Sequence, residues 1–127
     1  MIVVDASAAL LALLNAGEAR RALSNDTLIA PHLIDVEVTG ALRRQVRTGV
    51  IEAAAAEECL ASWQLLGLER VAVTHLLGRM WELRDNVTPY DAAYVAVAEE
   101  LDLALLTGDA RVANVPGPRC TTMVVRT

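Results

Sequence analysis

The feature of this sequence that most constrains its fold is a regular alternation of short apolar, β-type runs and longer helix-type segments along all 127 residues. The β-type runs contain many β-branched residues, and several helix-type segments begin at capping residues and end near glycine. Such an alternation implies parallel strands joined by helical crossovers that cover both faces of the sheet. We therefore expect an α/β fold with three layers, α/β/α, and a mostly parallel central sheet of about five strands.

Apolar periodicity and stop signals locate the expected elements. Strands are expected at residues 1–4, 27–30, 69–74, 103–107 and 120–125. Helices are expected at residues 6–15, 18–24, 31–48, 51–67, 75–86 and 88–101, with Pro31 in a first helical turn. Residues 108–117 are expected to form a turn region. No repeat or linker interrupts the series, so we expect a single domain that spans residues 1–127.

Composition excludes several function classes. All 11 basic residues are Arg, and the absence of Lys excludes P-loop chemistry and Schiff-base mechanisms. No apolar run approaches the ~18 residues of a membrane span, and the N-terminus lacks the basic segment of a signal peptide. Cys59 and Cys120 have no metal-type spacing, so we expect free thiols and a cytoplasmic location.

Two carboxylates, Asp91 and Asp109, lie at the start of a helix and just after a strand in the segment "TPYDAAYVAVAEELDLALLTGD". The helix after Asp91 travels roughly 15 Å at ~1.5 Å per residue. The strand that returns to Thr107 covers roughly 16 Å at ~3.3 Å per residue. If helix and strand run antiparallel, these displacements cancel and both acids reach the same edge of the domain. Asp5, which ends the first strand, reaches that edge too if its strand is parallel.

A fourth acid, Glu37, lies on the apolar face of the helix expected at 31–48. With about 100° per residue and Leu33 as zero, the apolar residues span about 0° to 180°, and Glu37 falls at about 40°. A carboxylate on a buried face needs a partner, because burial of an isolated charge is unfavourable. Ser7 and Thr107 are candidates to orient these carboxylates through hydrogen bonds.

Each acid has a structural explanation when it is considered alone. Asp5 can cap the following helix, Asp91 can belong to a capping box that begins at Thr88, and Asp109 can be a turn residue or a cap. Glu37 can pair with Arg44. A cluster of all four is a different matter, because crowded carboxylates raise one another's pKa and a hard divalent cation relieves the repulsion. Such a cation acidifies bound water and stabilises charge on a phosphoryl oxygen.

The motifs resemble those of PIN-domain ribonucleases, and more closely those of the VapC toxins of bacterial toxin–antitoxin pairs. The resemblance is carried by "VVDASAALL" at residues 3–11, by a P-x-L-x-x-x-E pattern at residues 31–37, and by the block at residues 90–109. It covers essentially the whole chain, and the last block is its most specific part.

The resemblance implies a metal-dependent endoribonuclease that cleaves single-stranded or looped RNA, often tRNA or ribosomal RNA, and so stops translation. It implies a homodimer and a VapB-type antitoxin whose C-terminal segment occupies the active-site groove and directs an Arg at the acids. It also implies an acidic quartet that binds Mg²⁺ or Mn²⁺, made of Asp5, Glu37, Asp91 and Asp109. The net charge of −5 then reflects in part a cation site. The residues expected to contact RNA phosphates are Arg43, Arg44, Arg47 and Arg111.

Two other function classes remain open on the sequence. A phosphoacceptor signalling domain also gathers acids at strand ends, but such receivers use an acid pair after the first strand and a Lys, whereas Asp5 is single and Lys is absent. A non-catalytic binding module could retain the same fold with its acids serving only as helix caps.

Overall fold

The computed structural model describes residues 1–127 and contains one five-stranded sheet in which every neighbouring pair of strands is parallel. The strand order is β3-β2-β1-β4-β5. The strands are β1 (Ile2–Val4), β2 (Leu28–Pro31), β3 (Leu68–Val71), β4 (Leu105–Thr107) and β5 (Thr122–Val124). The parallel sheet and the helices that flank it confirm the expected α/β fold.

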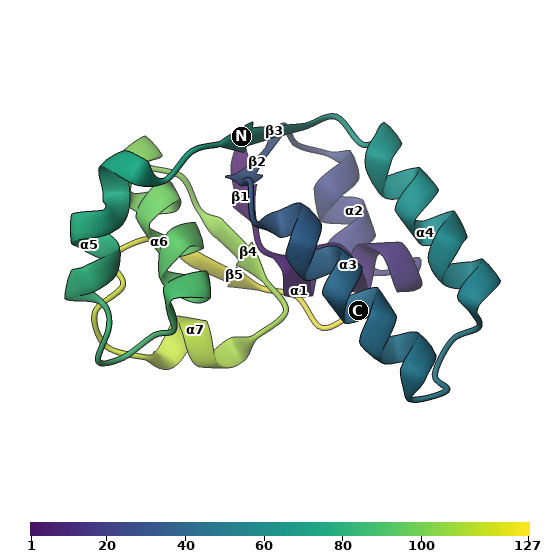
Figure 1. Cartoon of the computed structure of the whole chain (residues 1–127). Helices are drawn as coiled ribbons and strands as arrows, with labels where there is room; N and C mark the ends of the chain where they lie inside the picture. Colours follow the sequence, from purple (N-terminus) through teal and green to yellow (C-terminus); the bar gives the residue numbers. More distant parts are fainter.

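Helices cover both faces of the sheet. They are α1 (Ala6–Leu14), α2 (Glu18–Ser24), α3 (Ile34–Arg47), α4 (Ala53–Leu65), the 3₁₀ turn η1 (Thr74–Leu76), α5 (Leu77–Glu82), α6 (Pro89–Leu101) and α7 (Ala110–Asn114). Figure 1 shows α1 to α4 on one side of the sheet and α5 to α7 on the other. The chain winds from β1 towards β3 on the first side and returns through β4 to β5 on the second.

Strand β1 is the point where the winding reverses. Its two neighbours are β2, which follows it in the chain, and β4, which arrives from the opposite face. In parallel sheets a crevice opens beyond the carboxyl ends of the strands at such a switch point, because the flanking helices diverge to opposite faces. Asp5 follows β1 directly, and Thr107 is the last residue of β4.

The core is built from small aliphatic residues. Helix α6 is buried from Ala92 to Ala98, so it is surrounded on all sides rather than lying on the surface. Alanine side chains at three faces of this helix allow neighbouring elements to approach its backbone closely. This packing fixes the N-terminal turn of α6, which carries Asp91, relative to the central strands.

Several boundaries differ from those expected. Pro31 ends strand β2, where it pairs with Val71, and helix α3 begins only at Ile34. The third strand ends at Val71, and the expected helix at 75–86 is a 3₁₀ turn followed by the short α5. The expected turn region contains α7, which begins after Asp109. Asp102 ends α6 in a left-handed conformation, with φ of 53°, which nothing in the sequence pattern indicated.

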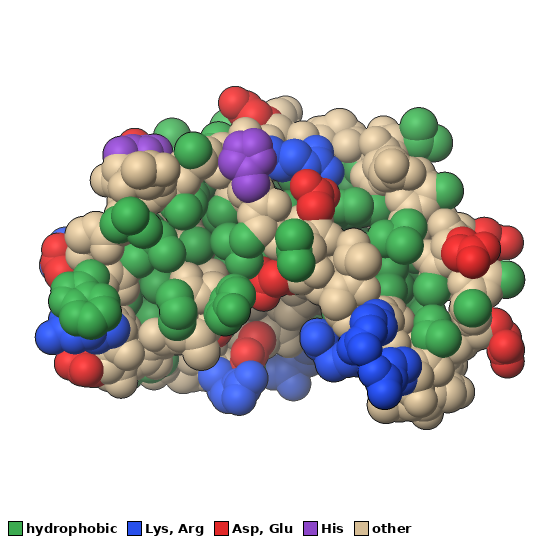
Figure 2. Space-filling view, viewed as in Figure 1, with side chains coloured by type: hydrophobic (Ala, Val, Ile, Leu, Met, Phe, Trp, Pro, Cys, Tyr) green, Lys and Arg blue, Asp and Glu red, His purple; other side chains and the backbone are tan.

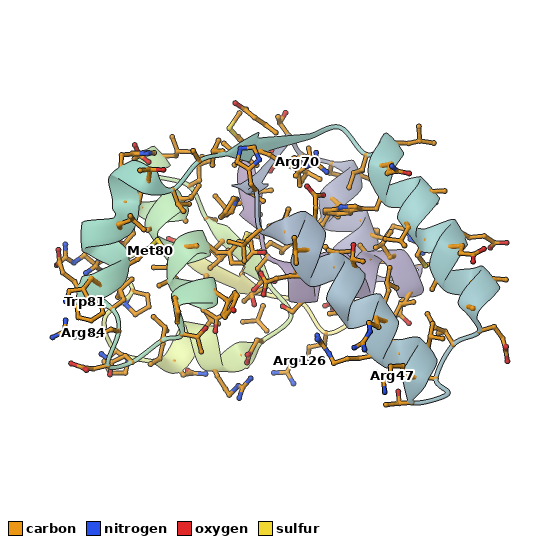
Figure 3. The ribbon with its side chains drawn as sticks, in the orientation of Figure 1. Arg47, Arg70, Met80, Trp81, Arg84 and Arg126 are labelled. Atoms are coloured by element: carbon orange, nitrogen blue, oxygen red, sulfur yellow. The ribbon has the colours of Figure 1, made fainter.

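Helix α3 is tied to its neighbours by Asp35. Its carboxylate accepts two hydrogen bonds from the Arg70 guanidinium, both of 2.8 Å, and a third of 2.8 Å from the Trp63 indole. Arg70 is the labelled side chain near β3 in Figure 3. These contacts join α3 to β3 and α4, so they fix the helix that carries Glu37.

Candidate active site

A pocket of 630 Å³ lies beyond the carboxyl ends of β1 and β4. Figure 2 shows it as a hollow near the middle of one face, with acidic side chains inside it and arginines along its lower rim. The pocket therefore occupies the crevice expected at the switch point of the sheet. The side chains of interest that line it are Asp5, Ser7, Glu37, Arg44, Tyr90, Asp91, Tyr94, Asp109 and Arg111.

Asp5 is the most deeply buried of the acids, with 6% of its surface exposed. One carboxylate oxygen, Oδ1, accepts hydrogen bonds from Ser7 Oγ at 2.6 Å and from the backbone N–H of Ala8 at 3.0 Å. Asp5 is thus the N-cap of α1. Burial raises the pKa of Asp5, and these hydrogen bonds offset the rise only in part.

Ser7 and Thr107 connect the ends of β1 and β4. The single hydroxyl proton of Ser7 is used on Asp5, so Thr107 donates to Ser7 across their 3.2 Å contact. Ser7 Oγ also accepts from the backbone N–H of Gly108 at 2.7 Å, and Thr107 Oγ1 accepts from that of Asp109 at 3.0 Å. The two hydroxyls therefore orient Asp5 and fix the loop that carries Asp109.

Gly108 lies where this loop passes the start of α1. An added Cβ would lie 2.9 Å from Leu11 Cδ1 and 3.3 Å from the backbone oxygen of Ser7. We expect Gly108→Ala to lower the free energy of unfolding by about 1–3 kcal/mol, because the loop must move away from α1 and lengthen its hydrogen bond to Ser7. Chemical denaturation measures this change.

Gly78→Ala is the matched control, because Gly78 lies in helix α5 with nothing within 4 Å of its added Cβ. Alanine is the better helix former there, so this variant should be as stable as the wild type or more so. Equal unfolding free energies for the two variants would contradict the close packing at Gly108.

Glu37 reaches the pocket from α3 and is half-buried. Its Oε1 accepts a hydrogen bond of 2.6 Å from the hydroxyl of Tyr94. Burial raises the pKa of Glu37, the nearby charges of Asp91 and Asp5 raise it further, and the hydrogen bond from Tyr94 lowers it. The structure shows no salt bridge between Glu37 and Arg44, although Arg44 lines the same pocket.

Asp91 lies in the first turn of α6, where Thr88 is the N-cap and accepts a hydrogen bond from the Asp91 backbone N–H at 3.2 Å. This bond uses the backbone of Asp91, and the residue itself lines the pocket. Burial raises the pKa of the Asp91 carboxyl, and the neighbouring charge of Asp109 raises it further. The two acids that bracket the α6–β4 segment thus lie within electrostatic range of each other.

Asp109 caps α7 and is held by an arginine. Its oxygens accept hydrogen bonds from the Arg111 backbone N–H at 2.9 Å and from the Arg111 guanidinium at 2.8 and 3.0 Å. This arginine lowers the pKa of Asp109, in contrast to the other three acids. The Arg111 side chain is 91% exposed, so the pair has little protection from solvent and salt.

Helix capping and a position in the pocket are therefore not alternatives for these acids. Asp5 and Asp109 cap helices through one oxygen and still line the pocket.

No three His, Cys, Asp or Glu side chains lie close enough together to bind one metal ion directly. The donor set still fits a hard divalent cation, because Mg²⁺ is commonly held by one or two carboxylates and keeps several waters. Oδ2 of Asp5 and Oε2 of Glu37 accept no hydrogen bond from the protein.

Only two of the four arginines that were expected to contact RNA line the pocket. Arg44 and Arg111 line the pocket, whereas Arg43 and Arg47 do not. Figure 3 shows Arg47 at the far end of α3. It also shows Arg126, which the sequence did not single out, between α7 and α3 near the lower rim.

Two tyrosines, Tyr90 and Tyr94, also line the pocket. Tyr94 is a core residue, 2% exposed, but its hydroxyl also reaches Glu37. Tyr90 is 61% exposed on the pocket wall. The spacing of Tyr94 three residues after Asp91, one helical turn, is the signal that could have linked it to the site.

The chain is similar to known proteins in both sequence and fold. The family model described as the PIN domain matches residues 2–118. A VapC ribonuclease of Mycobacterium bovis is 45% identical over 125 residues, which cover 98% of each chain. Ribonuclease VapC1 of Mycobacterium tuberculosis is 43% identical over 129 residues, covering 98% of this chain and 97% of that one. The crystal structure of VapBC2 from Rickettsia felis, bound to a promoter DNA fragment, has a similar fold, with a TM-score of 0.71, 13% identity and 98% coverage of both chains.

Proposed function

The chain belongs to the PIN-domain family, as a VapC-type member, and on that premise we propose that it is a divalent-metal-dependent endoribonuclease and the toxin of a toxin–antitoxin pair. The observation that carries the proposal is the convergence of Asp5, Glu37, Asp91 and Asp109 on one pocket at the switch point of the sheet. These acids come from four separate parts of the chain, and three of them have raised pKa values. A site that concentrates buried negative charge in this way is suited to bind a cation.

The four acids are proposed to hold Mg²⁺ or Mn²⁺, one or two of them directly and the others through waters bound to the ion. Such an ion, when bound, acidifies water and stabilises negative charge on the phosphodiester. Ser7 and Thr107 hold Asp5 in one orientation, so the free oxygen Oδ2 has a fixed direction. Burial of Asp5 also keeps bulk water from competing for this carboxylate.

The arginines of the rim are the proposed contacts for RNA phosphates. Arg44 and Arg111 line the pocket, and Arg111 has a largely exposed guanidinium. Arg43 and Arg47 lie farther along α3 and would meet more distant phosphates. We propose single-stranded or looped RNA, such as segments of tRNA or ribosomal RNA, as the substrate. An unpaired strand can bend its backbone into a pocket of this size, whereas a regular duplex cannot.

The proposed protein partners are a VapB-type antitoxin and a second copy of the chain. An arginine from the C-terminal segment of the antitoxin could pair with the acids, as Arg111 already does with Asp109. Exposed apolar residues at Val36 and Tyr90, on either side of the pocket, could be covered in a homodimer.

Purified protein should cut a mixture of tRNA and ribosomal RNA in the presence of Mg²⁺ or Mn²⁺. A chelator should abolish cutting, and Mn²⁺ added back should restore it. Cleavage that continues at the same rate in excess chelator would contradict the proposed metal dependence. Sequencing of the new RNA ends would then identify the target.

A second candidate is a non-catalytic binding module, and two observations favour it. Asp5 and Asp109 are helix N-caps, and no three acids lie close enough together to bind one metal ion. Calorimetric titration with Mn²⁺ separates the two. The module predicts no saturable binding, whereas the nuclease predicts binding that the Asp91→Asn substitution weakens.

A further inference from the structure

Tyr94 is a buried polar residue whose only hydrogen-bond partner lies in the candidate active site. It lies on α6, one helical turn after Asp91, and is 2% exposed. Its hydroxyl donates to Glu37 Oε1 at 2.6 Å. The two residues are 57 positions apart in the chain, so the bond joins α6 to α3 across the pocket.

The hydroxyl is not needed to fill space in the core. The ring of Tyr94 packs in the hydrophobic core, and a phenylalanine would occupy the same volume. A buried phenol hydroxyl must find a partner, because an unpaired polar group is costly there. The selection of tyrosine over phenylalanine at this position therefore requires an explanation outside the core, and Glu37 is the only acceptor that the structure provides.

The bond also determines how Glu37 faces the pocket. A glutamate side chain has three rotatable torsions, and no other hydrogen bond restrains this one in the structure. A short bond from a neutral hydroxyl to a carboxylate is charge-assisted and directional. It fixes Oε1 on the α6 side and leaves Oε2 without a protein donor.

We propose that Tyr94 is a positioning residue, which holds Glu37 by one oxygen and presents the other to the cation. The proposal rests on the function proposed above. It parallels the arrangement at Asp5, where Ser7 and Ala8 engage Oδ1 and leave Oδ2 free. Partners that orient metal ligands in this way typically change metal affinity when they are removed.

The test measures the Mn²⁺ dissociation constant by the electron paramagnetic resonance signal of free Mn²⁺, at one fixed pH and in the absence of RNA. Tyr94→Phe should bind Mn²⁺ about tenfold more weakly than the wild type. Tyr90→Phe is the matched control, because it makes the same chemical change on the exposed wall of the same pocket and should bind Mn²⁺ as the wild type does.

A double-mutant cycle separates positioning from a loosening of the fold. If Tyr94 acts through Glu37, Tyr94→Phe should have no further effect on Mn²⁺ affinity in a Glu37→Gln background. Additive losses, or wild-type affinity in Tyr94→Phe, would overturn the proposal. If the wild type binds Mn²⁺ and Asp91→Asn does not, additive losses or an unchanged affinity of Tyr94→Phe would contradict only the role of Tyr94. A wild-type chain that binds no Mn²⁺ overturns the proposed function as well.

Discussion

Asp91→Asn protein is expected to cut RNA at least about 100-fold more slowly than the wild type at equal Mg²⁺ or Mn²⁺ concentration. The substitution removes a negative charge from the middle of the pocket and keeps the shape of the side chain. The helix cap is unaffected, because Thr88 accepts its hydrogen bond from the backbone N–H of residue 91. The loss should therefore arise in the chemical step or in metal binding and not in folding.

Asp85→Asn is the control for this prediction. Asp85 is an exposed acid in the turn before α6 and does not line the pocket. Single-turnover cleavage of a labelled RNA compares the two variants, and their melting curves report the fold. Cleavage by Asp91→Asn at the rate of Asp85→Asn would remove Asp91 from the active site.

Asp5→Asn is expected to raise the melting temperature of the metal-free protein at neutral pH. Burial raises the pKa of Asp5 in the folded chain. Such a carboxyl binds more protons when the chain is folded than when it is unfolded. It therefore favours folding at pH values below its ordinary pKa, and this contribution is lost as the pH rises through the pKa of the folded state. At neutral pH the folded chain therefore carries a buried charge that Asn would remove. A rise of a few degrees is expected, since ~1 kcal/mol corresponds to roughly 4 °C in a domain of this size.

The pH dependence of this gain provides its control. The gain should shrink as the pH falls towards the ordinary pKa of Asp, because Asp5 of the wild type then becomes neutral as well. Asp109→Asn should give no such gain, because Arg111 lowers the pKa of Asp109. With saturating Mn²⁺ the order should reverse, as only the wild type is stabilised fully by the ion. A lower melting temperature for Asp5→Asn at every pH would contradict this account.

The positions of the acids followed from the sequence because they depend on backbone geometry. The helix after Asp91 and the segment that returns from residue 102 to residue 107 were expected to cover similar distances in opposite directions, so their ends were expected to meet. The helical phase of Glu37 similarly predicted a carboxylate on the buried face of its helix, and the structure shows it half-buried. Both arguments need only the period and the rise of regular elements, which the sequence pattern indicates well.

The side-chain partners were harder to predict because they depend on tertiary packing. The bond between Tyr94 and Glu37 joins residues 57 positions apart and requires a particular angle between α3 and α6. The ion pair between Arg111 and Asp109 was also not predicted, although the two residues lie only two positions apart in the chain. Pro31 was placed in a helix because its missing N–H suits a first turn, yet its carbonyl and fixed φ serve equally well at the end of a strand.

The central claim is that the pocket formed by Asp5, Glu37, Asp91 and Asp109 binds the divalent ion used for RNA cleavage. Anomalous diffraction from crystals soaked in MnCl₂ tests it most directly. We predict an anomalous peak in this pocket, within about 2.2 Å of carboxylate oxygens from at least two of the four acids. A Mn²⁺-dependent ribonuclease whose anomalous peaks all lie outside the pocket would contradict the account.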